Sequence, residues 1–350
     1  MKGVKILREK VRRVLLLLTN IRSLYILLAL GLIVFAGISI IIGVADISVG
    51  DIINIIGARL GLTSLKEHIS FGQETIIWNL RMPRILMALL TGINLAVTGA
   101  IYQAIFRNDM ADPYMLGVSS GASLGAALGF LVGGFLPLWA FIGALLANAL
   151  VISLSGMKGK VSPIRLLLSG LAINYFFAAL LSYIRLQGED RQIAMFVWGM
   201  GTLNAASYNR VAILFAITVP ILGLFLIYRK ELNLLLMGEE AAKAMGVDVS
   251  KVRKRLLVAS SILIATNVAF TGTIGFVGLI IPHVVRLLFG SNYKRTLPLC
   301  GFLGMYFVLF CDDLSRAVSS KGEVPLGIVT ALFGAPYFMY LIYKERRRES

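Results

Sequence analysis

The chain has 350 residues, of which 58% are hydrophobic and only 15% are charged, and its mean hydropathy is +0.84. This balance excludes an ordinary soluble globular protein and predicts an all-α polytopic membrane protein. The net charge of +16 does not indicate a nucleic-acid partner, because the Lys and Arg residues lie between apolar stretches rather than on a soluble face.

Ten windows are apolar enough to cross a bilayer as helices, since a span needs about 20 such residues. The first follows the basic segment 1–23 and resembles a signal peptide, but its apolar run is too long and no small-residue cleavage site follows, so we predict a retained helix. The predicted spans are 24–45, 82–106, 114–134, 137–156, 164–184, 211–228, 254–272, 274–290, 298–318 and 324–343.

The positions of the basic residues predict the orientation of these helices. Most Lys and Arg residues fall in the two termini and in every second loop, which the positive-inside rule assigns to the cytoplasm. We therefore predict a single transmembrane domain at 24–343 with a cytoplasmic N-terminus and a cytoplasmic basic tail at 344–350. Its longest connections are an external segment at about 46–80, with a short surface helix, and a cytoplasmic segment at about 229–253.

The centre of the cytoplasmic segment reads Met237-Gly-Glu-Glu-Ala-Ala-Lys-Ala-Met-Gly246. Small residues on one face, a Glu239–Lys243 pair at i, i+4 and a glycine at each end predict a short independent helix. From the residues alone, a surface helix that caps a loop is the simpler interpretation.

Two segments share the pattern N-x-A-x-T-G-x-I, one at 94–101 and the other at 267–274. The span count places them in opposite orientations, as an inverted repeat would. Chance similarity between helices rich in Gly, Ala and Thr is an equally open explanation.

No catalytic site is expected. Gly117-Val-Ser-Ser-Gly121 fits G-x-S-x-G, and His283 could act as the base of an intramembrane serine protease, but that elbow needs a strand before the serine. Here the serine begins a predicted membrane helix, so small residues for helix packing are the preferred interpretation. The chain also has no G-x-x-x-x-G-K-[ST] phosphate loop, so we do not expect it to hydrolyse ATP.

No metal site is expected either. Cys300 and Cys311 lie in one predicted helix, roughly 16 Å apart, which is too far for a disulfide. His68 and His283 are the only histidines, so no ligand cluster of metal-site spacing exists. The charged residues within the predicted spans fall at the span ends, whereas ion-coupled carriers usually place carboxylates near the middle of the membrane. We therefore expect the energy for transport to come from outside this chain.

Four segments together resemble the FecCD/BtuC-type permeases of type II ATP-binding-cassette importers for ferric siderophores, haem and cobalamin. They are Arg81-Met-Pro-Arg-Ile85, Asn108–Ala122 with its Ala-Asp-Pro-Tyr-Met-Leu-Gly core, Thr273-Ile-Gly-Phe-Val-Gly-Leu-Ile-Ile-Pro-His-Val-Val-Arg286, and Val324-Pro-Leu-Gly-Ile-Val-Thr-Ala-Leu-Phe-Gly-Ala-Pro336.

The resemblance implies an importer in the cytoplasmic (inner) membrane of a bacterium or archaeon. This chain would be a non-enzymatic transport subunit without its own cofactor, paired with a second permease copy as a homodimer. Two separate ATPase subunits would bind ATP and Mg²⁺, and an extracytoplasmic binding protein would deliver the ligand. The expected cargo is an iron chelate, first a ferric siderophore, with haem or cobalamin as alternatives; an ion-coupled secondary transporter or an intramembrane serine protease is less favoured.

The resemblance also assigns three groups of site residues. The helix that enters a groove of the ATPase comprises Gly238, Glu239, Glu240, Ala242, Met245 and Gly246. Arg81, Arg84 and Arg316 fall on positions that meet carboxylates of the binding protein, a role for which guanidinium forks are suited. Asn108 and Met110, with Ser162 opposite, match a cytoplasmic gate, although Asp109 stands where the family usually has proline.

Overall fold

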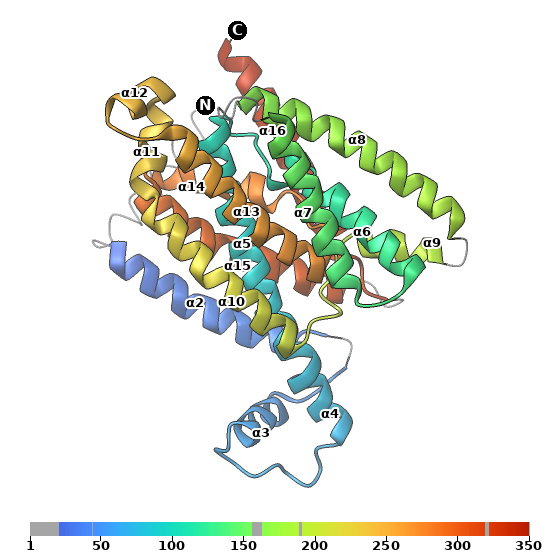
Figure 1. Ribbon diagram of the computed structural model, residues 1–350. Helices are drawn as coiled ribbons and strands as arrows, with labels where there is room; N and C mark the ends of the chain where they lie inside the picture. The colour runs from blue at the N-terminus through green and yellow to red at the C-terminus, as the bar shows by residue number, and fades with distance from the viewer. Residues whose placement is uncertain (1–20, 44, 156–162, 189–190, 319–321, 350) are drawn as a thin grey trace.

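The computed structural model describes residues 21–349 except 44, 156–162, 189–190 and 319–321, and within these residues every regular element is a helix (Figure 1). Ten helices coincide with the predicted spans, which confirms the all-α prediction. They are α2 (Ile21–Ile41), α5 (Met82–Phe106), α6 (Val118–Val132), α7 (Leu136–Ser155), α8 (Pro163–Gln187), α10 (Tyr208–Ile227), α13 (Val249–Thr271), α14 (Val277–Phe289), α15 (Tyr293–Ala317) and α16 (Leu326–Glu349).

Seven of the described helical spans are long and apolar enough to cross a membrane, and the apolar stretches in α6, α14 and α16 are shorter. The longest span is composite, because α4 (Phe71–Thr75), the π-helix η1 (Ile76–Arg81) and α5 run on from one another over Phe71–Phe106. At 13 residues α14 extends about 20 Å, less than the hydrocarbon thickness. It begins at Val277, three residues later than the sequence indicated.

Short helices mark the two ends of the bundle. At one end lie α3 (Val49–Arg59) and α4, with which the composite span begins, and at the opposite end lie α11 (Arg229–Met237), α12 (Glu239–Ala244) and the end of α16 (Figure 1). The helix α3 is N-capped by Ser48, whose side chain accepts from the Asp51 amide, and it buries Ile52 and Ile55 in a small separate apolar cluster. The remaining short elements are η2 (Pro113–Leu116) and α9 (Gln192–Gly199).

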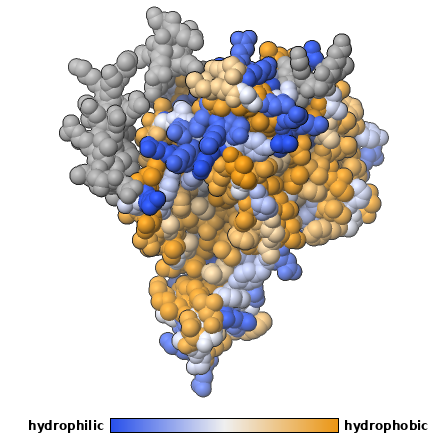
Figure 2. Space-filling view, turned by 60° about the vertical axis from the view of Figure 1, so that its left-hand side comes forward, coloured by the Kyte–Doolittle hydropathy of each residue, from blue (hydrophilic) through white to orange (hydrophobic). Residues whose placement is uncertain are grey.

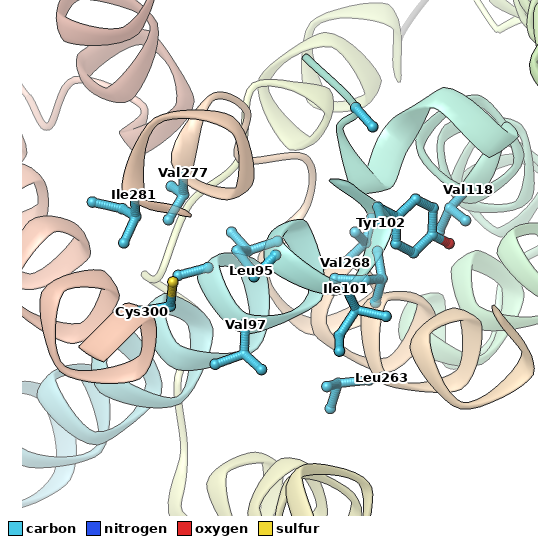
Figure 3. Close-up of a cluster of buried hydrophobic side chains, with 14 of the residues drawn as sticks. Leu95, Val97, Ile101, Tyr102, Val118, Leu263, Val268, Val277, Ile281 and Cys300 are labelled. Carbon is cyan, nitrogen blue, oxygen red and sulfur yellow. The ribbon is translucent and has the colours of Figure 1, made fainter. Parts of the chain in front are cut away.

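The centre of the bundle is α5, in which 78% of the apolar window of its span is buried. Leu95, Ile101 and Tyr102 of α5 lie among side chains of α6, α13, α14 and α15 (Figure 3). By contrast, only 17 to 22% of the windows of α2, α8 and α10 are buried. Figure 2 shows the result as a hydrophobic belt below a hydrophilic end, the surface that a lipid bilayer accommodates.

Glycines allow the backbones around α5 to approach one another. A Cβ at Gly92 would lie 2.2 Å from the carbonyl oxygen of Gly304 in α15, and a Cβ at Gly99 would lie 1.9 Å from that of Gly278 in α14. In the same way α6 meets α7 at Gly121 and Gly143. Since lipid tails are as apolar as leucine side chains, such close contact supplies much of the attraction between membrane helices.

We expect Gly99→Ala to destabilise the bundle by about 1–3 kcal/mol, the usual cost of overpacking, because its neighbour is backbone that cannot rotate away. Gly37→Ala in α2 is the matched control, since a Cβ there meets nothing within 4 Å. The apparent melting temperature of each variant in detergent is the measurement. Equal melting temperatures would contradict the packing interpretation.

The two segments with the N-x-A-x-T-G-x-I pattern pack together in the core. Asn94 of α5 donates to Asn267 of α13 at 3.5 Å, and Thr218 of α10 donates to Asn94 at 3.1 Å. Both asparagines are fully buried. Corresponding residues of the two segments therefore meet, as a two-fold relation requires, although the inverted repeat itself stays a prediction.

Candidate functional site

The segment predicted to be cytoplasmic contains the short helix expected from its sequence. Gly238, with φ +122°, separates α11 from α12, and Gly246, with φ +83°, follows α12; glycine adopts both conformations without strain. Between them Ala242 is completely buried against the neighbouring helices, because α12 packs on both α11 and α13. The apolar attachment of α12 to the body of the protein is therefore made by one small side chain.

Charged groups fix α12 to α13. Glu239 pairs with Lys243 at 2.8 Å within α12 and with Arg253 of α13 at 3.3 Å. The Lys243 hydrogen bond and the charge of Arg253 hold the pKa of Glu239 below its ordinary value, so the pair persists at neutral pH. The sequence indicated the Glu239–Lys243 pair, whereas Arg253 was missed because it lies 14 residues away on another helix.

The outer face of this segment is exposed and adaptable. Met237 is 67% and Met245 is 62% exposed, on either side of the buried Ala242. Glu240 is exposed as well. Flexible methionine side chains next to charges suit a surface that contacts another protein.

The predicted gate turn ends α5 in a Schellman arrangement. The Asn108 amide donates to the Gln103 carbonyl and the Arg107 amide to the Ala104 carbonyl, with Arg107 itself in the left-handed region at φ +49°. The Asn108 side chain then accepts from the Met110 amide at 2.8 Å, which closes an Asx turn. Ser162, predicted to lie opposite, falls outside the described residues.

The three arginines predicted to dock the binding protein are buried at the end of the bundle that carries α3. Each residue is 6 to 8% exposed. Arg84 pairs with Asp312 at 2.9 Å and with Glu323 at 2.8 Å. Arg316 pairs with Asp312 at 3.2 Å and also with Asp313. Their guanidinium groups are thus engaged within the chain, and the docking role stays a prediction.

Arg81 and Arg316 also cap the C-terminal end of α2. Arg81 donates to the carbonyls of Ile40, at 2.6 Å, and Ala45, at 2.7 Å, and Arg316 donates to the Ile42 carbonyl at 2.6 Å. The last carbonyls of a helix lack partners within it and carry its negative dipole end, so two cations stabilise this terminus. Sequence reasoning did not find this role, because α2 and α15 are far apart in the chain.

An apolar pocket of about 590 Å³ lies between the 272–276 connection and α16. Phe276, which N-caps α14 from the left-handed region at φ +68°, lines it together with Met200, Ala331 and Met339. The ring of Phe276 packs against Gly334 of α16, where a Cβ would lie 2.2 Å from the ring. The lining is mostly apolar, with Thr273 as its one hydroxyl-bearing side chain.

The G-x-S-x-G segment does not form a nucleophile elbow. It is preceded by η2, a 3-10 helix, rather than by a strand, and Gly117, with φ +81°, is the N-cap residue before α6. Gly121 faces Gly143 of α7, where a side chain would collide with backbone. These glycines therefore serve helix packing, as the preferred interpretation held.

Comparisons with known proteins agree with this architecture. The FecCD transport family matches residues 28–344. The chain is 38% identical over 309 residues to the hemin transport system permease protein HmuU of Yersinia pestis, covering 84% of this chain and 92% of that protein. It is 40% identical over 275 residues to the cobalamin import system permease protein BtuC of Halobacterium salinarum, covering 77% and 73%. The iron(3+)-hydroxamate import system permease protein FhuG of Bacillus subtilis is 36% identical over 296 residues, with 79% and 88% covered.

A solved structure has the same fold. It is an inward-facing conformation of a metal-chelate type ABC transporter, with a TM-score of 0.79 and 32% identity, covering 92% of this chain and 99% of the other. Sequence and structure thus agree over nearly the whole chain. The chain belongs to the FecCD transport family and is a multi-pass membrane permease subunit of an ATP-binding-cassette importer of the iron-chelate, haem and cobalamin class, in which a separate ATPase hydrolyses ATP.

Proposed function

We propose that two copies of this permease form the pathway for an iron chelate, a ferric siderophore, handed over by an extracytoplasmic binding protein. Iron chelates are named for several of the similar permeases, including the iron(3+)-hydroxamate and Fe(3+)-citrate systems of Bacillus subtilis. Haem and cobalamin are the alternatives, because the hemin and cobalamin permeases are equally similar to this chain. Both termini lie in the cytoplasm in this proposal.

The observation that best supports a transport role driven by a separate ATPase is the structure of α12. This helix is joined to α11 and α13 on its inner face and is exposed on its outer face. Gly238, Glu239, Glu240, Met245 and Gly246 form the contact with the ATPase in this proposal, whereas Ala242, predicted to belong to the same contact, is buried and holds α12 on its neighbouring helices instead. ATP and Mg²⁺ bind to that ATPase, and closure of the ATPase dimer moves α12 as a lever. Because Ala242 and the Glu239–Arg253 pair join α12 to α13, the movement reaches the transmembrane helices.

At the other end, Arg81, Arg84 and Arg316 are proposed to receive the binding protein. A carboxylate of the partner would then replace an internal one. Glu323 is the partner that can be displaced, because its side chain is 31% exposed, whereas that of Asp312 is fully buried. Asn108, Met110 and Ser162 are proposed to narrow the cytoplasmic exit.

The test is reconstitution of the complete importer in lipid vesicles. We expect uptake of a ferric siderophore that needs the ATPase, ATP and the loaded binding protein together, with ATP hydrolysis rising when the loaded binding protein is added. Ferric hydroxamate, ferric catecholate, haem and cobalamin are offered in parallel. Preference for haem or cobalamin would overturn the siderophore assignment, and uphill uptake by this chain alone would overturn the whole proposal.

A further inference from the structure

A proline inside α14 leaves one backbone carbonyl without its helical donor, and another helix supplies a donor there. Pro282 has no amide hydrogen, so it cannot donate to the carbonyl of Gly278 four residues earlier. Gln103, in the last turn of α5, donates from its side-chain nitrogen to the carbonyls of Gly278 and Leu279, at 3.4 and 3.3 Å. The proline-containing turn of α14 is therefore held by α5.

The same glutamine is joined to the gate turn through an arginine. Arg286, one turn beyond Pro282, donates to the side-chain oxygen of Gln103 and pairs with Asp109 at 3.2 Å. The Arg286 side chain is 10% exposed and that of Asp109 is 66% exposed. A mostly buried cation thus receives its counter-charge from an exposed residue of the turn.

The other side of the turn lies beside the start of α12. Arg107 is one of two described non-glycine residues with positive φ, a conformation that costs an arginine about 1 kcal/mol. A Cβ built on Gly238 would lie 4.0 Å from a terminal nitrogen of Arg107. The Arg107 side chain therefore reaches the start of α12, while Asp109 of the same turn pairs with Arg286 of α14.

We propose that Asp109 and Arg286 form a latch that holds the turn 107–110 against α14 in the resting importer and opens when the ATPase moves α12. An ion pair with one exposed member is reversible and can release the turn. This inference rests on the proposed function, since it assigns a part to a gate driven by a partner ATPase.

Asp109→Asn tests the latch, because asparagine keeps the shape of the side chain and removes its charge. In the assembled importer without ligand, we expect ATP hydrolysis to rise about two- to fivefold, the population change that loss of a part-exposed ion pair produces. Labelling of Met110→Cys by a water-soluble maleimide should rise by the same factor. The two native cysteines are buried and give a low background.

Asp248→Asn is the matched control. It also removes one cytoplasmic carboxylate from an exposed pair, that with Lys251, and asparagine retains the N-cap of α13. We expect it to change neither readout. A rise as large as that of Asp109→Asn would overturn the latch, because general loss of negative charge would then explain both.

A double-mutant cycle separates loss of the Asp109–Arg286 pair from any other effect of replacing the buried Arg286. If the pair is the latch, Asp109→Asn has no further effect on labelling once Arg286→Gln is present; additive effects would overturn the inference. Failure of the proposed function is distinguishable, because it would show as absent ATP-driven uptake by the unaltered importer. Labelling of the turn needs no uptake and tests the latch in either case.

Discussion

Replacing Ala242 with aspartate should uncouple ATP hydrolysis from ligand delivery. Ala242 is fully buried where α12 packs on α11 and α13, so a carboxylate there has neither water nor a cation of its own. An unpaired buried charge costs several kcal/mol, which is more than one ion pair and one alanine contact can offset. We expect α12 to leave its position and ligand-stimulated ATP hydrolysis to fall by at least about tenfold.

Ala244→Asp is the control for this prediction. It introduces the same carboxylate two residues along the same helix, at a position that is exposed. It should leave the melting temperature of the permease unchanged and the position of α12 intact, as judged by protection of the segment from protease. A contrary result is possible in Ala242→Asp. If the protease assay shows that α12 has left its position and the ligand still stimulates ATP hydrolysis normally, coupling does not pass through α12.

The sequence predicted most of the fold because the bilayer imposes a simple rule. A single segment that crosses lipid can satisfy its own backbone hydrogen bonds only as a helix, so length and apolarity alone locate spans such as α2 and α10. Helix α14 departs from the rule, because Phe276 turns the chain and Gly272–Gly275 remain non-helical against other protein segments. Its late start was not predictable from hydropathy.

The candidate site was predicted less completely, since its partners come from distant parts of the chain. Local signals identified α12, because glycines, small residues and an i, i+4 pair lie within ten positions. The pairing of Arg84 with Asp312 joins residues 228 apart, and no local pattern indicates it. The role of Gln103 could have been suspected only from Pro282, which had to leave an unpaired carbonyl somewhere on its helix.

Replacing Arg84 with alanine should destabilise the permease by about 3–5 kcal/mol, the cost of breaking a buried pair from one side. Arg84 contacts both oxygens of Asp312, and its other terminal nitrogen contacts Glu323. Without it, the fully buried Asp312 keeps only Arg316, which Asp313 shares. Lysine cannot replace it, because a single ammonium group cannot reach both carboxylates in the geometry of a guanidinium fork. The measurement is the apparent melting temperature in detergent.

Arg59→Ala provides the comparison, since Arg59 pairs with Glu74 at the same end of the molecule but is 43% exposed. Exposed pairs contribute about 1 kcal/mol or less, so its melting temperature should stay close to that of the unaltered protein. If Arg84→Ala lowers the melting temperature as little as Arg59→Ala does, Asp312 must take up a proton or reach water. Arg84 would then have no structural role that competes with docking.

The opposite outcome is that Arg84→Ala unfolds readily, while Arg84→Ala combined with Asp312→Asn recovers stability. The unpaired buried charge of Asp312 is then the cause of the instability. In that case Arg84 organises this end of the bundle, and the proposed docking of a binding-protein carboxylate would have to displace Glu323, its more exposed partner.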